Sequence, residues 1–108
     1  AMTQEEKARG LMNRTELGRL KGMLFYYDIP KEVSFWMKDT LIPLDIVFIS
    51  EEFLVVKVVE ADPEPGVPDD DLTRYPSGGL VKYVVEMNQG LASSYDIVPG
   101  TEVMVLEF

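Results

Sequence analysis

The sequence contains no cysteine and no histidine. The lack of cysteine excludes disulfide bonds, thiolate metal sites and a cysteine nucleophile. The lack of histidine removes the commonest general base at neutral pH and the commonest zinc ligand. Any catalysis is therefore confined to carboxylates, lysine, tyrosine, serine or threonine, and we expect neither a metal nor a cofactor.

Basic residues are also scarce, because ten lysines and arginines stand against nineteen acidic residues and give a net charge of −9. This charge repels phosphate backbones, whereas a nucleic-acid site needs clustered basic residues on one face. We therefore expect no nucleic-acid partner.

Long apolar runs are missing too. No stretch approaches the roughly 18 consecutive apolar residues of a membrane span, and no basic and apolar leader opens the chain. The sequence thus predicts a soluble protein with no membrane span. As given it would be cytoplasmic, and export would require a leader that has been removed.

The length fits one domain over residues 1–108, since a chain of this size buries about two-thirds of its unfolded surface. Near the start, Thr3 followed by Glu6 matches a capping box. This pattern predicts an N-terminal helix from Gln4 to Met12.

Strand patterns dominate the rest of the chain. Residues 22–27 and 33–38, separated by a turn at 28–30, read as two strands of a hairpin. Residues 44–50 and 53–60 flank a tight acidic turn and form the strongest β signal. Three further elements are expected near the C-terminus: a strand at 83–88, a short helix at 90–95 and a final strand at 102–108.

Between these strands, residues 60–79 form an acidic stretch rich in proline and glycine. Residues 60–71 carry six acidic residues, three prolines and no base, so we expect a solvated loop that does not order itself. The run Asp69-Asp70-Asp71 lacks the alternation and the glutamate that a calcium-binding EF-hand loop requires.

Strands without helix-length crossovers favour an antiparallel or mixed sheet that curls on itself. We predict a mainly β (α+β) fold, namely a small curled β-barrel or half-barrel with an N-terminal helix and one short C-terminal helix.

Six short motifs occur along the chain: RGLMNR (9–14), GMLF (22–25), FWMKDT (35–40), IPLDIVFI (42–49), VVEMNQG (84–90) and VPGTEV (98–103). In their order and spacing they resemble the DUF192 family, a group of small bacterial, archaeal and phage-borne proteins with no established activity. The most specific piece is FWMKDT followed by PLD. The resemblance implies a compact, mainly β fold with an N-terminal helix and a polar patch near the tryptophan motif.

The chain departs from the family pattern at two points. Asp39 stands where the family usually has asparagine. This difference puts in doubt any hydrogen-bonding role that this position would share with other members of the family. Many relatives also begin with an extra strand, often behind a secretory leader, that this sequence lacks. A missing first strand would leave a sheet edge open to a partner.

The tryptophan motif suggests a site. Trp36 and Lys38 alternate with Phe35 and Met37, so if the latter pair packs inward, the former lies outside or in a cleft. An aromatic platform beside a cation suits a sugar or a planar acid, although a core-edge tryptophan and a solvated lysine would give the same pattern.

Polar residues in other motifs extend this candidate site. Asp39, Thr40 and Asp45 would either cap a turn or face the mouth of the barrel. Glu86, within a strand, needs a partner if it is buried, and Arg9 or Arg14 would serve. The full candidate ligand-binding set is Arg9, Trp36, Lys38, Asp39, Thr40, Asp45 and Glu86.

Three functions fit these residues. We favour a non-catalytic module that binds a small polar ligand or a peptide. The alternatives are a hydrolase that uses Asp45 and Glu86 as acid and base, and a protein-interaction module of phage or mobile-element type that binds through an open edge or the acidic loop. The ligand, the oligomeric state and the presence of catalysis stay open at this level.

Overall fold

A computed structural model describes residues 22–104, which are mainly β with antiparallel sheets and one short α-helix. The elements, in chain order, are β1 (Gly22–Lys31), β2 (Ser34–Phe35), β3 (Leu44–Ile49), β4 (Val55–Ala61), the 3-10 helix η1 (Asp69–Asp71), β5 (Tyr75–Pro76), β6 (Val81–Asn88) and α2 (Leu91–Ser94). Helix α2 confirms the short helix predicted at 90–95. The predicted helix Gln4–Met12 and the end of the predicted strand 102–108 lie outside the described residues.

The four long strands form one sheet in the order β1-β6-β3-β4, and all neighbours are antiparallel. Within residues 22–104, β1 and β4 stand at opposite edges and are not joined. A closed barrel needs an unbroken ladder around its circumference. We predicted a barrel or a half-barrel, and the described residues form no closed barrel. The remaining strands, β2 and β5, are two residues long and pair only with each other.

The hairpin β3–β4 is formed as predicted, around the acidic residues Glu51 and Glu52. Its turn is closed by two backbone hydrogen bonds, from Phe53 N to Ser50 O (3.0 Å) and from Ser50 N to Leu54 O (2.8 Å). The hairpin is local in sequence, and this makes its pairing readable from the strand pattern.

The hairpin predicted for 22–27 and 33–38 is wrong, because β1 pairs with β6 and β2 pairs with β5. Strand β1 continues through the predicted turn to Lys31, with a register shift between Tyr26 and Lys31. Pro30 falls in this irregular part, where its missing N–H removes no ladder bond. At the start of β1, Gly22 permits close pairing, since a Cβ there would lie 2.7 Å from Glu86 O.

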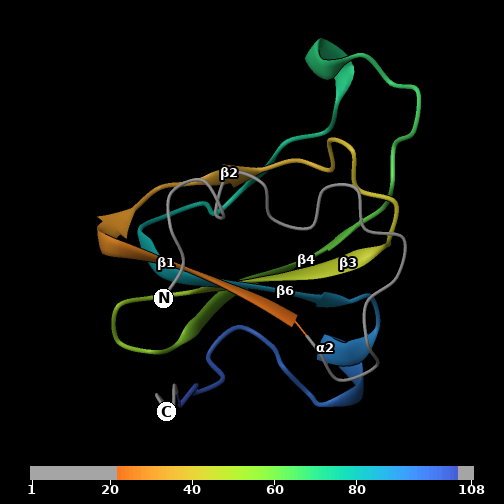
Figure 1. Cartoon of the computed structure of the whole chain (residues 1–108). Coiled ribbons are helices and arrows are strands. Elements are labelled where there is room, and N and C mark those ends of the chain that lie inside the picture. The colour runs from red at the N-terminus through yellow and green to blue at the C-terminus, as the bar shows by residue number, and fades with distance from the viewer. Residues whose placement is uncertain (1–21, 105–108) are drawn as a thin grey trace.

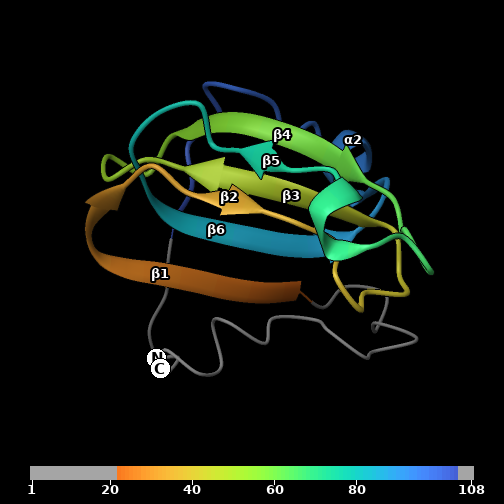
Figure 2. The same ribbon diagram turned by 90° about the horizontal axis from the view of Figure 1, so that it is seen from above.

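Other parts of the chain cover both faces of the four-stranded sheet (Figures 1 and 2), and each face buries its own hydrophobic core. One face lies under β2 and β5, where Phe35 meets Phe25 and Phe48 edge-to-face at ring distances of 5.3 and 5.9 Å. The other face lies against α2 and the segment that follows it, with Val47, Ile49 and Ala92 buried there. We call these the β2–β5 face and the α2 face.

The acidic loop, defined as residues 62–74, is more structured than its composition predicts. It contains η1, buries Leu72 and is closed by Thr73, whose N and Oγ1 donate to the two carboxylate oxygens of Glu64 at 3.0 and 3.2 Å. The predicted solvated loop is observed, since none of residues 62–71 is buried. Its additional local structure has a physical reason. One apolar anchor and a side-chain hydrogen-bond network compensate for the scarcity of apolar residues.

None of the helices within residues 22–104 combines the length and the apolar character needed to cross a lipid bilayer.

Candidate functional site

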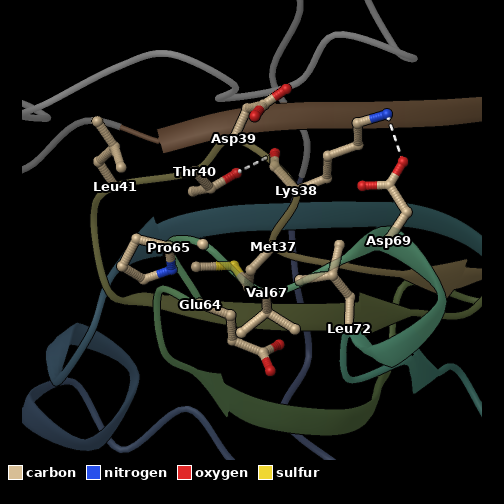
Figure 3. Close-up of a pocket in the computed structure, with 11 residues that line it drawn as sticks. Met37, Lys38, Asp39, Thr40, Leu41, Glu64, Pro65, Val67, Asp69 and Leu72 are labelled. Carbon is tan, nitrogen blue, oxygen red and sulfur yellow. Dashed lines mark hydrogen bonds and ion pairs between the residues drawn. The ribbon is translucent and has the colours of Figure 1, made fainter.

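A cavity of about 240 Å³ lies between the chain segment after β2 and the acidic loop (Figure 3). The segment Met37–Leu41 lines one side, and the other side is lined by residues 64–67 together with Asp69 and Leu72. The FWMKDT motif and the acidic loop are far apart in sequence, and they meet because Ser34–Phe35 pairs with Tyr75–Pro76. The short strands therefore position the site.

A tight turn shapes the first wall. Thr40 N donates to Met37 O at 3.1 Å, and Thr40 Oγ1 donates to Lys38 O at 3.1 Å. Asp39 has a φ of 53°, in the left-handed region that aspartate and asparagine tolerate better than other non-glycine residues. Either residue suits this turn, so the aspartate in place of the family's usual asparagine is compatible with its geometry.

The floor of the cavity is apolar and its rim is polar. Met37 and Leu72 are 2% and 6% exposed, and both face the space between the two walls in Figure 3. At the rim, Lys38 Nζ lies 2.9 Å from Asp69 Oδ2 and joins the turn to η1. The hydrogen bond from Lys38 to Asp69, together with the charge of this aspartate, raises the pKa of the lysine.

Trp36 stands beside this cavity, on the outside of the molecule. Phe35 and Met37 point into the core, so the predicted alternation is observed, and Trp36 is only half-buried. Two cations approach its ring: Arg74 Cζ lies 3.9 Å from the ring centroid and Lys38 Nζ lies 5.3 Å from it.

Asp45 has a structural role on the α2 face. It is 2% exposed, and its Oδ2 accepts hydrogen bonds from Gly90 N (3.0 Å) and Ala92 N (2.9 Å). These amides belong to the start of α2, whose first N–H groups have no partner within the helix. Asp45 therefore caps a helix that is distant in sequence.

Glu86 is buried on the β2–β5 face, opposite Met23 of β1 and Ile46 of β3. Burial raises the pKa of Glu86 from 4.5 to about 7. Burial also raises the pKa of Tyr27, and the nearby Glu86 carboxylate adds to that shift. Arg9 and Arg14, the predicted partners of Glu86, lie outside the described residues.

Asp45 and Glu86 point to opposite faces of the sheet. Asp45 pairs with Met87, whereas its neighbour Ile46 pairs with Glu86. Paired residues share a face and successive residues alternate, so the two carboxylates are separated by the sheet itself. They cannot flank one substrate as the acid and base of a glycoside hydrolase must.

The structure thus brings together four of the predicted residues: Lys38, Asp39 and Thr40 line the cavity, and Trp36 stands next to it. Asp45 and Glu86 lie elsewhere, and Arg9 is outside the described residues. Sequence reasoning missed Asp69 and Arg74. Arg74 could have been recognised from the sequence as a candidate, because it is the only basic residue between Lys57 and Lys82.

Among residues 22–104, no three acidic side chains gather closely enough to hold a metal ion.

The sequence pattern of the DUF192 family, described as "Uncharacterized ACR", matches residues 1–105. A crystal structure of a protein of unknown function from Novosphingobium aromaticivorans DSM 12444 is similar, with 40% identity and a TM-score of 0.82 over 93% of this chain and 68% of that chain.

A second crystal structure, from Sinorhizobium meliloti 1021, has 29% identity and a TM-score of 0.81 over 93% of this chain and 74% of that chain. The name of that protein describes it as a candidate transcription regulator. No curated protein matches the chain.

Proposed function

The chain belongs to the DUF192 family, whose description names no activity, and we propose that it is a non-catalytic module that binds a small ligand in the cavity beside the FWMKDT motif. One observation carries this proposal. Three residues that the sequence marks as candidates, Lys38, Asp39 and Thr40, line a concave space with an apolar floor and a polar rim.

The size and lining of the cavity suit a small amphipathic molecule or one side chain of a peptide. Its volume of about 240 Å³ is just below the range of about 300–1,000 Å³ that is typical of small-molecule pockets. An apolar part would contact Met37 and Leu72, and a polar group would meet Lys38 and Asp39 at the rim.

A binding role fits this lining better than catalysis. The Thr40 hydroxyl donates to a backbone carbonyl, and the Glu64 carboxylate accepts two hydrogen bonds from Thr73. A nucleophile needs a base within hydrogen-bond reach, and neither group is arranged in that way.

A fragment screen by ligand-observed NMR on the full chain tests the proposal. Amphipathic fragments should bind, and backbone amide shifts in the bound protein should concentrate in residues 37–41 and 64–72. Val67→Phe places a bulky ring in the cavity wall and should abolish this binding. A matched control is Val98→Phe at an exposed valine far from the cavity lining, which should leave binding unchanged.

Shifts that map elsewhere on the sheet, or binding that survives Val67→Phe, would contradict the proposal. Circular dichroism of each variant shows whether it retains the fold, so that a loss of binding is not confused with unfolding.

A further inference from the structure

We propose that Arg74, held over Trp36, forms a carboxylate-binding subsite next to the cavity, so that the ligand is a small organic acid rather than a sugar. This inference rests on the proposed function and specifies the chemical class of its ligand.

The geometry of Arg74 is that of a guanidinium on an aromatic face. Its Cζ lies 3.9 Å from the centroid of the Trp36 ring. A guanidinium that stacks on a ring keeps its N–H groups directed outward along its own plane, where they match the two oxygens of a carboxylate. The contact with the indole therefore leaves the hydrogen-bond donors of the arginine available.

The two cations at this ring differ in their partners. Lys38 is paired with Asp69 at 2.9 Å, and this is the only ion pair within 4.0 Å among residues 22–104. Arg74 therefore makes no ion pair with a described residue. An anion bound at Arg74 would also reduce the repulsion between the two cations around one ring.

The same geometry argues against a sugar. Sugar recognition by tryptophan uses an open ring face, and the guanidinium occupies one face of Trp36. A carboxylate needs no displacement, because it binds to the arginine in place. The subsite also adjoins the cavity: Trp36 directly precedes the lining segment Met37–Leu41, and Arg74 follows the lining residue Leu72 by two positions.

Calorimetric titration of the full chain with sodium benzoate tests the inference, with benzamide as its uncharged analogue and glucose as the sugar probe. Benzoate should bind saturably, benzamide should bind at least tenfold more weakly, and glucose should not bind. Because Trp36 is the only tryptophan in the chain, its fluorescence should follow the same benzoate isotherm.

Three variants sharpen this test. Arg74→Gln should raise the Kd for benzoate at least tenfold, and Arg74→Lys should not restore it, because an ammonium lacks the guanidinium fork. Lys82→Gln removes one positive charge from β6 and should leave the Kd unchanged. No saturable benzoate binding, equal affinity for benzamide, or an unchanged Kd in Arg74→Gln would each overturn the inference.

Failure here is distinguishable from failure of the proposed function. If Val67→Phe abolishes fragment binding while Arg74→Gln binds benzoate normally, the cavity binds ligands and the carboxylate subsite is refuted. If Arg74→Gln loses benzoate while Val67→Phe has no effect on any ligand, the subsite is supported and the cavity is refuted.

Discussion

The two faces of the sheet each bury one carboxylate, and the surroundings of that carboxylate differ between the faces. On the α2 face, Asp45 accepts two backbone N–H groups and ties β3 to the start of α2. On the β2–β5 face, the Glu86 side chain lies against an apolar core, and its pKa is raised to about 7 by burial. Asp45 stabilises the fold through two hydrogen bonds, whereas the charged form of Glu86 is costly to the fold.

This contrast teaches that burial alone does not identify a functional acid. Neither carboxylate lines the cavity, which is formed instead by a turn and a loop above the β2–β5 face. The charged groups of the candidate site lie at its partly or fully exposed rim, whereas the two buried acids act on stability. Four predictions test this division.

The largest effect is expected for Asp45→Ala. It removes the acceptor for Gly90 N and Ala92 N. Bonds to a charged group contribute about 1.5 to 3 kcal/mol each, so the free energy of unfolding should fall by about 3 to 6 kcal/mol. Urea unfolding at pH 7 measures this loss. Asp70→Ala, at an exposed acid in η1, is the control and should change stability by no more than about 0.5 kcal/mol. Equal effects of both variants would show that Asp45 is not a cap.

A change of opposite sign is expected for Glu86→Gln. The folded-state pKa of Glu86 lies above its unfolded value, so the folded protein binds this proton more tightly and stability falls as pH rises from about 4.5 to about 7. The full effect is about 3 kcal/mol, from about 1.4 kcal/mol per pKa unit. Urea unfolding at pH 5 and pH 8 should therefore show Glu86→Gln more stable than the parent mainly at pH 8. A difference that does not depend on pH would contradict this.

A smaller loss is expected for Asp39→Val in the turn of the cavity wall. A β-branched residue at a φ of 53° should cost about 1 to 2 kcal/mol, because the left-handed conformation crowds its Cβ. Asp39→Gly and Asp39→Asn should change thermal stability little. If all three variants were equally destabilised, the carboxylate rather than the backbone conformation would be what matters at this position.

The smallest effect on overall stability is expected for Lys38→Met, because exposed ion pairs contribute little to folding. The change should instead appear locally, as faster amide hydrogen exchange in residues 64–72, since the pair with Asp69 joins this loop to the turn. Lys82→Met should leave exchange in the loop unchanged. Unaltered exchange in Lys38→Met would mean that Leu72 and Glu64 alone hold the loop.

Local patterns predicted much of the fold. The hairpin β3–β4, strand β6 and helix α2 follow from runs of residues close in sequence. The pairing of β2 with β5 did not, because it joins Ser34–Phe35 to Tyr75–Pro76 across a loop whose composition pointed to disorder. The buried anchor Leu72 gives that loop its structure, and one apolar residue is a weak signal among so many acids.

The candidate site was predicted in part for a similar reason. Trp36 and Lys38 lie together because alternation within one strand is readable from sequence. Whether Asp45 and Glu86 share a face depends on the register between β3 and β6, where an offset of one residue reverses the answer. The acidic loop supplies Asp69 and Arg74, and their positions depend on a tertiary contact that no local pattern specifies.

Among the described residues, β6 is the last long strand in sequence, yet it lies between β1 and β3 in the sheet. During synthesis, β1 and the hairpin β3–β4 leave the ribosome first and have no common partner until residues 81–88 emerge. Closing contacts over such a long stretch of chain is slow, because the entropy of the intervening segment must be lost first. The four-stranded sheet therefore cannot be completed until residues 81–88 have been synthesised, and before that point the apolar faces of β1 and of the hairpin β3–β4 lack their shared partner.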